Sequence, residues 1–402
     1  MYDVIVLGAG PAGNIAAHRL SDDGHSVAVL DWRRDLGDKL CTGIVGRECV
    51  ERYPPDRAHI LREAQSASVI APSGKSHRIA KDEPQAYIID RVAFVASLAR
   101  RASDAGAHYR VGEKVTGIQF SKTSVDVRTT SRSGEKKYTA RVAIIASGFS
   151  SPLLRMAGLA NGGRADHMLG CQAQVVAHHL ENTEIYLGET IAPGSFGWLV
   201  PVSGSAALLG LVSRQKLNGH MGAFLSTLQQ KGKIGTVIKP PKQWGIPLKA
   251  LPRTFRNGAV VVGDAAGFAK PTTGGGIYYA LMSGEIAAEV IHEAFVANDF
   301  STRKLRKYEA RWEAVFGREL RIGYYARLLY EALDDDQVER LLNRFVSAQI
   351  EHEFLSSSEF SFDWHSSSIL KAISHRELGK IIRSFGPMVA PLLLRLNGSK
   401  SG

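Results

Sequence analysis

The chain has 402 residues, 44% hydrophobic and 22% charged, a composition typical of a globular protein with room for two or three domains. Its three cysteines (Cys41, Cys49 and Cys171) lack paired spacing and no His/Cys cluster accompanies them, so we expect neither disulfides nor bound metal, as in a reducing cytoplasm. The net charge of +11 favours anionic partners (phosphates, acidic membrane surfaces or acidic electron carriers) or else a solvated basic surface, whereas the scattered basic residues argue against nucleic acid.

The first predicted strand begins at Tyr2 and runs into Gly8-Ala9-Gly10-Pro11-Ala12-Gly13, which leaves no room for a signal peptide. This Gly-x-Gly-x-x-Gly turn lets the backbone approach a pyrophosphate and aims a helix N-terminus at it. A second apolar strand, residues 27–31, ends in a carboxylate placed to accept the hydroxyls of an adenosine ribose. The sequence therefore predicts a dinucleotide site, whose expected contacts are Gly8, Gly10, Ala12, Gly13 and Asp31.

The next region combines a loop, helices and a strand meander. Residues 35–44 form a glycine-bearing loop that we expect beside the cofactor, ahead of a helix over residues 46–53. Residues 67–79 alternate as a strand does, and Asp90-Arg91 opens a helix over residues 92–105. The strands of the meander, which returns to the main sheet, are expected over residues 111–120, 125–130 and 137–146.

Residues 163–255 are predicted to form an antiparallel sheet that roofs a pocket, because short strands alternate there with Gly, Pro and Ser turns. Phe196 and Trp198 lie two apart on one strand and should project to the same face, where they line a channel or form an aromatic pair in the core. The strands are expected over residues 167–176, 183–187, 197–201, 206–213 and 243–246.

The chain then returns to the first domain through an apolar strand that ends in Gly263-Asp264. Asp264 is placed there to bind the ribityl chain of a flavin, which favours FAD over NAD as the cofactor. The run Gly274-Gly275-Gly276-Ile277 opens a helix over residues 278–294, and its N–H groups are placed to contact the pyrimidine edge of the flavin, where negative charge gathers on reduction.

The remainder, residues 299–402, is predicted to be helical, with an apolar stripe from Tyr308 to Leu328 that is typical of core packing. Residues 381–396 are apolar with interspersed arginines. This segment is expected to cover a lipid pocket or pack on the body, with docking on a membrane surface as the alternative. No run of about 18 apolar residues predicts a membrane span, so the expected location is cytoplasmic, with peripheral membrane association left open.

The nucleotide and flavin motifs, with Asp90-Arg91 between them, resemble the large family of FAD enzymes with the para-hydroxybenzoate hydroxylase type of fold. The resemblance implies that Arg91 reaches toward FAD, that the backbone around Val115 meets the adenine, and that Gly148 belongs to a third cofactor fingerprint. A helix-capping Asp90 followed by a surface Arg91 is the alternative. Ser147 stands where aromatic hydroxylases of this group usually carry Asp, which weakens a hydroxylase assignment.

Two further runs, Phe196-Gly197-Trp198-Leu199-Val200-Pro201 and Lys39-Leu40-Cys41-Thr42-Gly43, resemble those of the geranylgeranyl reductase family. Phe196 stands where Tyr is common and Val200 where Phe is common. The resemblance implies hydride transfer from reduced FAD to isoprenoid double bonds of a chlorophyll side chain, an archaeal-type ether lipid or a menaquinone tail. It also implies that Trp198 and Phe196 line the substrate channel, and that Cys41, unless it is an inert buried thiol, lies with Gly43 beside the isoalloxazine.

The predicted architecture is α/β, with a Rossmann-like FAD-binding domain that combines a parallel sheet and a β-meander, an antiparallel-sheet substrate domain and a helical C-terminal region. The alternative function is a flavin-dependent monooxygenase or halogenase acting on an aromatic substrate, although neither Lys75 nor Lys81 can be assigned as a halogenase lysine. NADPH and ferredoxin both stay open as electron donor, and His167 is one of several candidate proton donors. The FAD-binding domain is expected over residues 1–66, 87–160 and 257–298. The substrate domain is expected over residues 67–86 and 161–256, and the helical region over residues 299–402.

Overall fold

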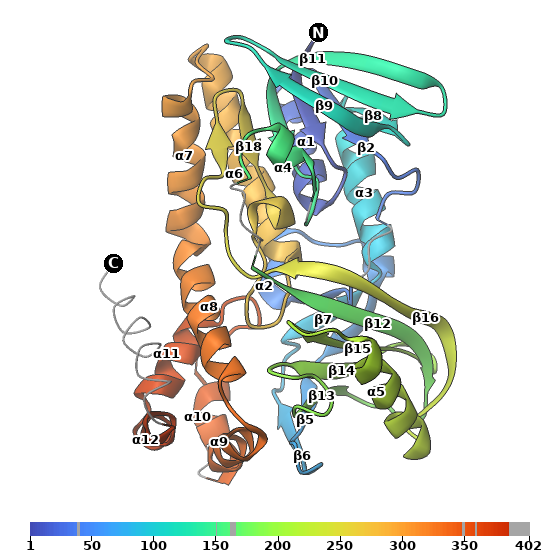
Figure 1. The fold of residues 1–402 in the computed structure, drawn as a ribbon, viewed down its shortest axis with the longest axis vertical. Coiled ribbons are helices and arrows are strands. Elements are labelled where there is room, and N and C mark those ends of the chain that lie inside the picture. Colours follow the sequence, from blue (N-terminus) through green and yellow to red (C-terminus); the bar gives the residue numbers. More distant parts are fainter. Residues whose placement is uncertain (38–40, 150, 161–165, 348–349, 358–359, 386–402) are drawn as a thin grey trace.

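The computed structural model describes residues 1–37, 41–149, 151–160, 166–347, 350–357 and 360–385. It has two sheet-containing bodies, one above the other in Figure 1, with helices of the C-terminal region along one side. The predicted α/β class with parallel and antiparallel sheets and C-terminal helices is confirmed.

The first body contains an eight-stranded sheet in which the main strand order is β17-β18-β11-β1-β2-β8. The strands from β18 to β8 run parallel. The apolar residues of β18, β1, β2 and the C-terminal half of β11 are almost completely buried, as expected of a parallel sheet covered on both faces, whereas the edge strand β8 is largely exposed. Strands β9 and β10 complete the predicted meander with β11. The strands are β1 (Tyr2–Leu7), β2 (Val27–Asp31), β8 (His108–Val111), β9 (Lys114–Phe120), β10 (Val125–Ser131), β11 (Gly134–Ile145), β17 (Phe255–Arg256) and β18 (Ala259–Val261).

Three long helices accompany this sheet, and α1 packs against both of the others. Their bounds are α1 (Pro11–Asp22), α3 (Arg91–Asp104) and α6 (Ile277–Val296). The shorter helical elements of this part of the chain are α2 (Arg47–Arg52), η1 (Arg57–His59), α4 (Leu153–Met156) and η2 (Gly263–Ala266).

The second body is a seven-stranded sheet with the order β16-β12-β15-β14-β13-β5-β6. One face packs against helix α5 (Asn218–Gln230), and the other faces a small sheet of β3 (Ile44–Gly46), β4 (Ile60–Ala64) and β7 (Ala86–Ile89). The strands of the larger sheet are β5 (Ser66–Ile70), β6 (Ser76–Ala80), β12 (His167–Ala177), β13 (Thr183–Leu187), β14 (Phe196–Ser203), β15 (Ala206–Ser213) and β16 (Ile234–Pro247).

Three expectations for this region need correction. Residues 67–79 are not one strand: β5 and β6 form a hairpin, because Gly74 at φ +86° closes a turn by donating to Ala71 O. The strand expected over residues 243–246 begins at Ile234, and helix α5 was not predicted. The last two differences arise from long-range contacts. Strand β16 pairs with β12 along its length, and helix α5 packs on the apolar face of the sheet.

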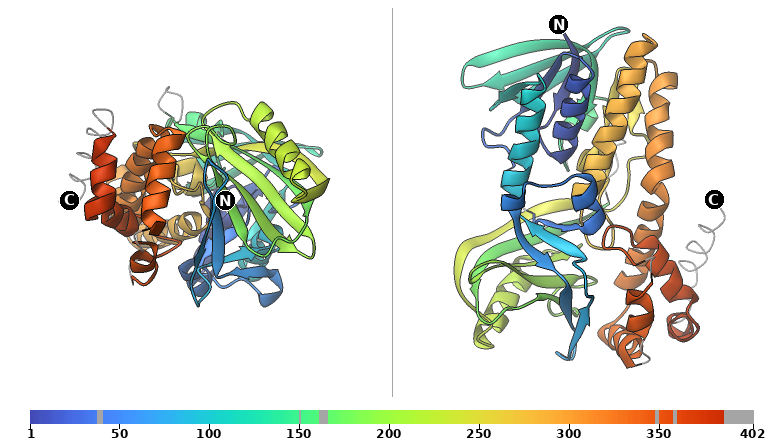
Figure 2. Two further views of the ribbon diagram at one scale, coloured as in Figure 1. Left: turned by 90° about the horizontal axis from the view of Figure 1, so that it is seen from below. Right: turned by 180° about the vertical axis from the view of Figure 1, so that it is seen from behind.

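The C-terminal region is helical, as predicted, and α7 and α8 form one continuous rod with a short π-helical segment, η3, between them (Figure 2). The predicted stripe is core packing, since Tyr308, Trp312, Phe316 and Leu320 are buried. Residues 386–396 of the predicted apolar tail lie outside the described residues. Among the helices that the structure describes, none is both long and apolar enough to cross a bilayer. The elements are α7 (Thr302–Trp312), η3 (Glu313–Gly317), α8 (Arg318–Glu331), α9 (Asp335–Ser347), α10 (Ile350–Leu355), α11 (Ser366–Ser374) and α12 (Arg376–Ser384).

Candidate cofactor and substrate site

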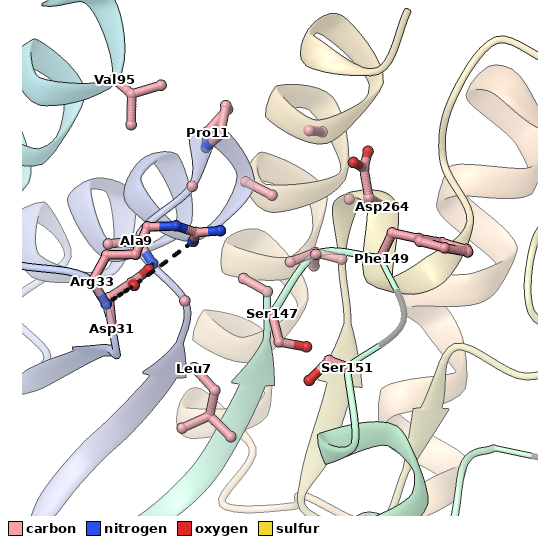
Figure 3. A pocket seen from close by; sticks show the side chains of 18 of the residues that line it. Leu7, Ala9, Pro11, Asp31, Arg33, Val95, Ser147, Phe149, Ser151 and Asp264 are labelled. Carbon is pink, nitrogen blue, oxygen red and sulfur yellow. Dashed lines mark hydrogen bonds and ion pairs between the residues drawn. The ribbon is translucent and has the colours of Figure 1, made fainter. Parts of the chain in front are cut away.

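A cavity of about 590 Å³ lies at the carboxyl ends of the parallel strands β1, β2 and β11 (Figure 3). Ligands of open α/β sheets bind at this edge. The predicted cofactor residues that line the cavity are Gly8, Gly10, Ala12, Asp31, Cys41, Arg91, Val115, Gly148, Asp264, Gly274, Gly276 and Ile277. The predicted site residues outside its lining are Gly13, Gly43, Gly275, Phe196 and Trp198.

The glycine turn after β1 presents an uncapped helix to the cavity. Helix α1 has Gly10 as its N-cap, with no side-chain hydrogen bond to its first N–H groups, so these are available to an anion. A Cβ built on Gly10 meets no protein atom within 4 Å, whereas one on Gly13 would lie 2.0 Å from Gly8 O. Gly10 therefore leaves room in the cavity, and Gly13 permits close packing of helix on strand.

Asp31 is held rigidly at one end of the cavity. Its Oδ2 accepts the Ala9 N–H at 2.8 Å and its Oδ1 accepts the Arg33 N–H at 2.8 Å. Each carboxylate oxygen has further lone pairs, so the group can still accept ribose hydroxyls. Figure 3 shows Arg33 next to Asp31. Trp32, which is 62% exposed and also lines the cavity, was missed by the sequence analysis, although its position directly after Asp31 was a usable signal.

Glu113 is a second buried acid near this end, and sequence reasoning did not identify it. Burial alone would raise its pKa, but hydrogen bonds from Lys136, Tyr138 and Thr129 outweigh burial and lower the pKa below its ordinary value. It therefore stays ionised beside the cavity and fixes the meander next to Val115.

The start of α3 has the cap expected of Asp90, but Arg91 is not on the surface as that alternative expected. The Asp90 carboxylate caps the helix by accepting the Ala93 N–H at 3.0 Å. Arg91 is buried rather than on the surface, lines the cavity, and donates to Gly37 O at 2.5 Å. It thereby holds the loop that leads toward Cys41.

The opposite end of the cavity is formed by the residues around α6. The N-cap of this helix is Gly276, which again supplies no side-chain cap. A Cβ on Gly276 would lie 2.8 Å from Asp264 Oδ1, so the carboxylate lies directly against this glycine. Figure 3 shows Asp264 and Asp31 at opposite sides of the cavity. An acid and the N-terminus of a long helix therefore occur at each end.

The loop that carries Cys41 is bound to the antiparallel sheet by Gln172. Thr42 Oγ1 donates to Gln172 Oε1 at 3.1 Å, and Gln172 Nε2 donates to Cys41 O at 3.4 Å. Gly43 has φ +75°, and a Cβ there would be 2.4 Å from Ile89 O, so only glycine fits without strain. Gln172 was not predicted, because nothing in the sequence pairs it with residue 42.

Two tryptophans pack together on one face of the sheet, and we call the pair the indole shelf (Trp198 and Trp244). Trp198 is only 5% exposed and belongs to a buried apolar cluster, as the core alternative for the aromatic pair expects. Each indole lies over the glycine directly opposite on the neighbouring strand: Trp198 over Gly210 and Trp244 over Gly170. Their ring centroids are 6.5 Å apart, edge to face. Trp244 lines the cofactor cavity, so the shelf extends from the cavity along one face of the seven-stranded sheet.

Phe196 continues the shelf, with its ring centroid 6.1 Å from that of Trp198, and the two side chains share one face as predicted. The buried Trp198 Nε1–H has no hydrogen-bond partner among the described residues. His167 alternates to the face of β12 opposite Gly170 and packs on Phe149, with 5.2 Å between ring centroids. Its position does not favour a role on the shelf.

Comparisons with known proteins agree with this geometry. The family model of pyridine nucleotide-disulphide oxidoreductases matches residues 2–182. The digeranylgeranylglycerophospholipid reductase of Methanosarcina mazei is 30% identical over 87% of this chain and 90% of its own length. The enzyme of that name from Methanocaldococcus jannaschii is 29% identical, covering 85% of this chain and 90% of its own.

Among solved structures, a geranylgeranyl bacteriochlorophyll reductase-like protein from Thermoplasma acidophilum superposes with a TM-score of 0.83 at 26% identity, covering 96% of this chain and 98% of its own. A flavin-dependent brominase has a TM-score of 0.66 at 18% identity, covering 87% and 92%, which shows only a shared fold. The cavity fits FAD, because it offers an uncapped helix N-terminus, a cradle that a Cβ on Gly10 would fill, and a carboxylate at each end.

Proposed function

The chain belongs to the geranylgeranyl reductase family of FAD-dependent oxidoreductases, and on this basis we propose that it saturates isoprenoid double bonds of a lipid of the archaeal ether type. The observation that carries the proposal is the continuity of the indole shelf with the cofactor cavity through Trp244. The two methanogen enzymes are named as reductases of digeranylgeranylglycerophospholipids and are 29–30% identical to this chain, whereas the bacteriochlorophyll reductase-like structure is 26% identical, which favours this lipid over chlorophyll or menaquinone precursors.

The proposed cofactor site uses the residues already described. Gly8, Gly10 and Ala12 hold the pyrophosphate at the α1 N-terminus, and Asp31 holds the ribose, with the backbone of Val115 near the adenine. Bound FAD, when reduced, supplies a hydride to one carbon of a double bond, and the other carbon takes a proton. Asp264 binds the ribityl chain, and the loop ending at Gly276 approaches the flavin ring. The remaining proposed contacts are Cys41, Arg91, Gly148, Gly274 and Ile277, which line the cavity. Gly13, Gly43 and Gly275 lie outside its lining, and their proposed role is to permit close packing of the segments that form the site.

An unactivated alkene has no carbonyl oxygen to stabilise, so this chain's contribution is positioning and exclusion of water. In this proposal the prenyl chain lies against Trp244, which lines the cavity, and Trp198 and Phe196 support that indole from the same apolar cluster. Cys41, on the loop that Gln172 anchors over the same face, confines the alkene from the other side. The proposed substrate domain is residues 67–86 and 161–256, the FAD domain residues 1–66, 87–160 and 257–298, and residues 299–402 form the helical region.

The test is mass spectrometry of a digeranylgeranylglycerol phospholipid after anaerobic incubation with dithionite-reduced, FAD-loaded protein. We expect stepwise addition of hydrogen pairs, strongly reduced in Trp198→Ala and Trp244→Ala variants that retain FAD. The control is Gly222→Ala on α5, where an added Cβ meets no atom within 4 Å. Unchanged lipid together with oxygen-dependent modification of an aromatic substrate would instead support a monooxygenase or halogenase.

The electron donor and membrane contact are separate parts of the proposal. The net charge of +11 is compatible with an acidic carrier such as ferredoxin and with NADPH as the electron donor. Stopped-flow measurement of the rate at which each donor reduces the bound flavin distinguishes the two.

A lipid substrate favours peripheral membrane association. Co-sedimentation with anionic vesicles at low and high salt tests it, and equal recovery in the pellet with and without vesicles would contradict it.

A further inference from the structure

A short segment of the C-terminal region, the C-terminal strap (Ser361–Ser366), is built into the far side of the cofactor site. Ser361 Oγ donates to one carboxylate oxygen of Glu48 at 2.9 Å, and Trp364 Nε1 donates to the other at 2.5 Å. The backbone N–H of Ser366 donates to Glu319 at 2.9 Å. The strap therefore joins α2, which follows the Cys41 loop, to the long helical rod of α7 and α8.

Asp363 of this strap caps α2 across more than three hundred residues of chain. Its two carboxylate oxygens accept the N–H groups of Gly46, the N-cap, at 3.2 Å and of Cys49 at 3.1 Å. A Cβ on Gly46 would lie 2.2 Å from Asp363 Oδ2, so glycine is needed at that position. Tyr279 Oη, on α6, donates to Asp363 O at 3.2 Å.

Lys270 lies between this strap and the glycine loop of the cofactor site. Its backbone pairs with that loop twice, donating to Gly275 O at 2.9 Å and accepting from the Gly274 N–H at 2.7 Å. Its side chain is buried, and Nζ donates to Phe362 O at 2.6 Å and lies 4.6 Å from the centroid of the Phe362 ring. A Cβ on Gly275 would be 3.8 Å from Nζ, so the amine lies directly behind the loop.

The surroundings of the amine are acidic. Burial lowers the pKa of Lys270 below its ordinary value, and the negative charges of Asp363, Glu319 and Glu48 oppose that change. His365, whose pKa burial lowers to about 3, is neutral and adds no competing positive charge. Desolvation likewise raises the pKa of Asp363, and the positive charge of Lys270 opposes that change. A buried amine and a buried carboxylate thus influence each other through their charges, with the amine directly behind the glycine loop.

We infer that Lys270 is a positioning residue that keeps a positive charge behind the Gly274–Gly276 loop and thereby favours the reduced state of the bound flavin, with Asp363 partly offsetting that charge. Negative charge gathers at the pyrimidine edge on reduction, and a fixed charge in a low-dielectric interior acts over several ångströms. This inference rests on the proposed binding of FAD in the cavity, but not on the identity of the lipid.

The experiment measures the midpoint potential of protein-bound FAD against reference dyes in the absence of prenyl substrate. In Lys270→Met we expect the preference for reduced over oxidised FAD to fall about tenfold, which is about 30 mV more negative for a two-electron couple. Asp363→Asn should move the potential in the opposite direction, because it leaves the positive charge less compensated. Lys270→Arg should remain close to the parent.

An electrostatic effect predicts midpoint-potential shifts of opposite sign in Lys270→Met and Asp363→Asn. Loosening of the strap would instead shift the midpoint potential in the same direction in both variants. Tyr279→Phe is the matched control, since it removes a hydrogen bond to Asp363 O without changing charge, and no shift is expected. Shifts of equal sign, or an unchanged potential in Lys270→Met, would overturn the inference. If Lys270→Met does not fold, a negative or absent shift in Asp363→Asn overturns it. Failure of the parent protein to bind FAD would instead refute the proposed function.

Discussion

Gly210→Ala should damage the proposed substrate surface without touching the cofactor site. A Cβ at this position would lie 2.3 Å from Trp198 Cζ2 and 2.8 Å from Cys171 O, whereas ordinary contacts begin at 3.4 Å. The indole must therefore move by about 1 Å, because the strand backbone on its other side cannot. Overpacking of this kind lowers the free energy of unfolding by about 1–3 kcal/mol. Replacing a strand glycine by alanine offsets roughly 0.5–1 kcal/mol of that loss, because glycine has more conformational freedom in the unfolded chain.

Gly210→Ala should change the rate of prenyl reduction more than it changes the free energy of unfolding. Misplacement of a reacting group by about 1 Å can cost on the order of a hundredfold in rate, so we expect kcat for prenyl reduction to fall by about 10- to 100-fold. FAD affinity should not change, because Gly210 does not line the cofactor cavity. The assay is the initial rate of hydrogen-pair addition together with fluorescence titration of FAD, with Gly222→Ala as the control. A destabilised Gly210→Ala variant with the parental kcat/KM would refute the idea that the shelf positions the alkene.

Three further predictions concern single positions. Gly43→Ala adds left-handed backbone strain of about 1–2 kcal/mol and places a Cβ 2.4 Å from Ile89 O. Its free energy of unfolding in urea should therefore fall more than that of Gly24→Ala, where φ is +82° but the added Cβ meets no atom. Equal losses of unfolding free energy in the two variants would contradict this. Asp31→Ala should weaken FAD binding by about 1.5–3 kcal/mol in calorimetric titration, and unchanged affinity would exclude the ribose contact. Burial alone would raise the pKa of Glu285, but hydrogen bonds from a tyrosine and two arginines lower this pKa below its ordinary value of 4.5. The ionised carboxylate therefore contributes fully to stability above about pH 4.5, and this contribution is lost as the pH falls through the lowered pKa of the folded state. Denaturant unfolding between about pH 3 and pH 6 should therefore show a weaker acid dependence in Glu285→Gln, and identical slopes would contradict this.

The motifs that depend on local backbone chemistry were predictable from the sequence. The turn at Gly8–Gly13, the acid at Asp31 and the strand before Asp264 all place their residues at the cavity, because each combines a buried strand with a glycine or an acid at its end. Helix α5 was not predictable in the same way. It occurs in a region of strands, and its helical pattern acquires meaning only against the apolar face of the sheet that it covers.

Contacts set by strand register lay beyond the sequence. Gly170 and Gly210 are unremarkable glycines until β12 pairs with β16 and β14 with β15, which brings an indole over each. The cap of α2 is a stronger case, because Gly46 leaves a helix N-terminus uncapped locally and the acid that completes it is Asp363. A helix prediction from residues 46–53 was correct, but what stabilises the helix could not be seen there.

These long-range contacts bear on the kind of catalysis that the site supports. The indole shelf, the Cys41 loop held by Gln172 and the glycine loop backed by Lys270 belong to different parts of the chain, and each is positioned by a buried contact from another part. Hydride transfer to an unactivated alkene depends on the distance and angle between reacting atoms rather than on a strong acid or base at that carbon. Substitutions that shift packing, such as Gly210→Ala, should therefore lower kcat more than removal of an exposed charge does.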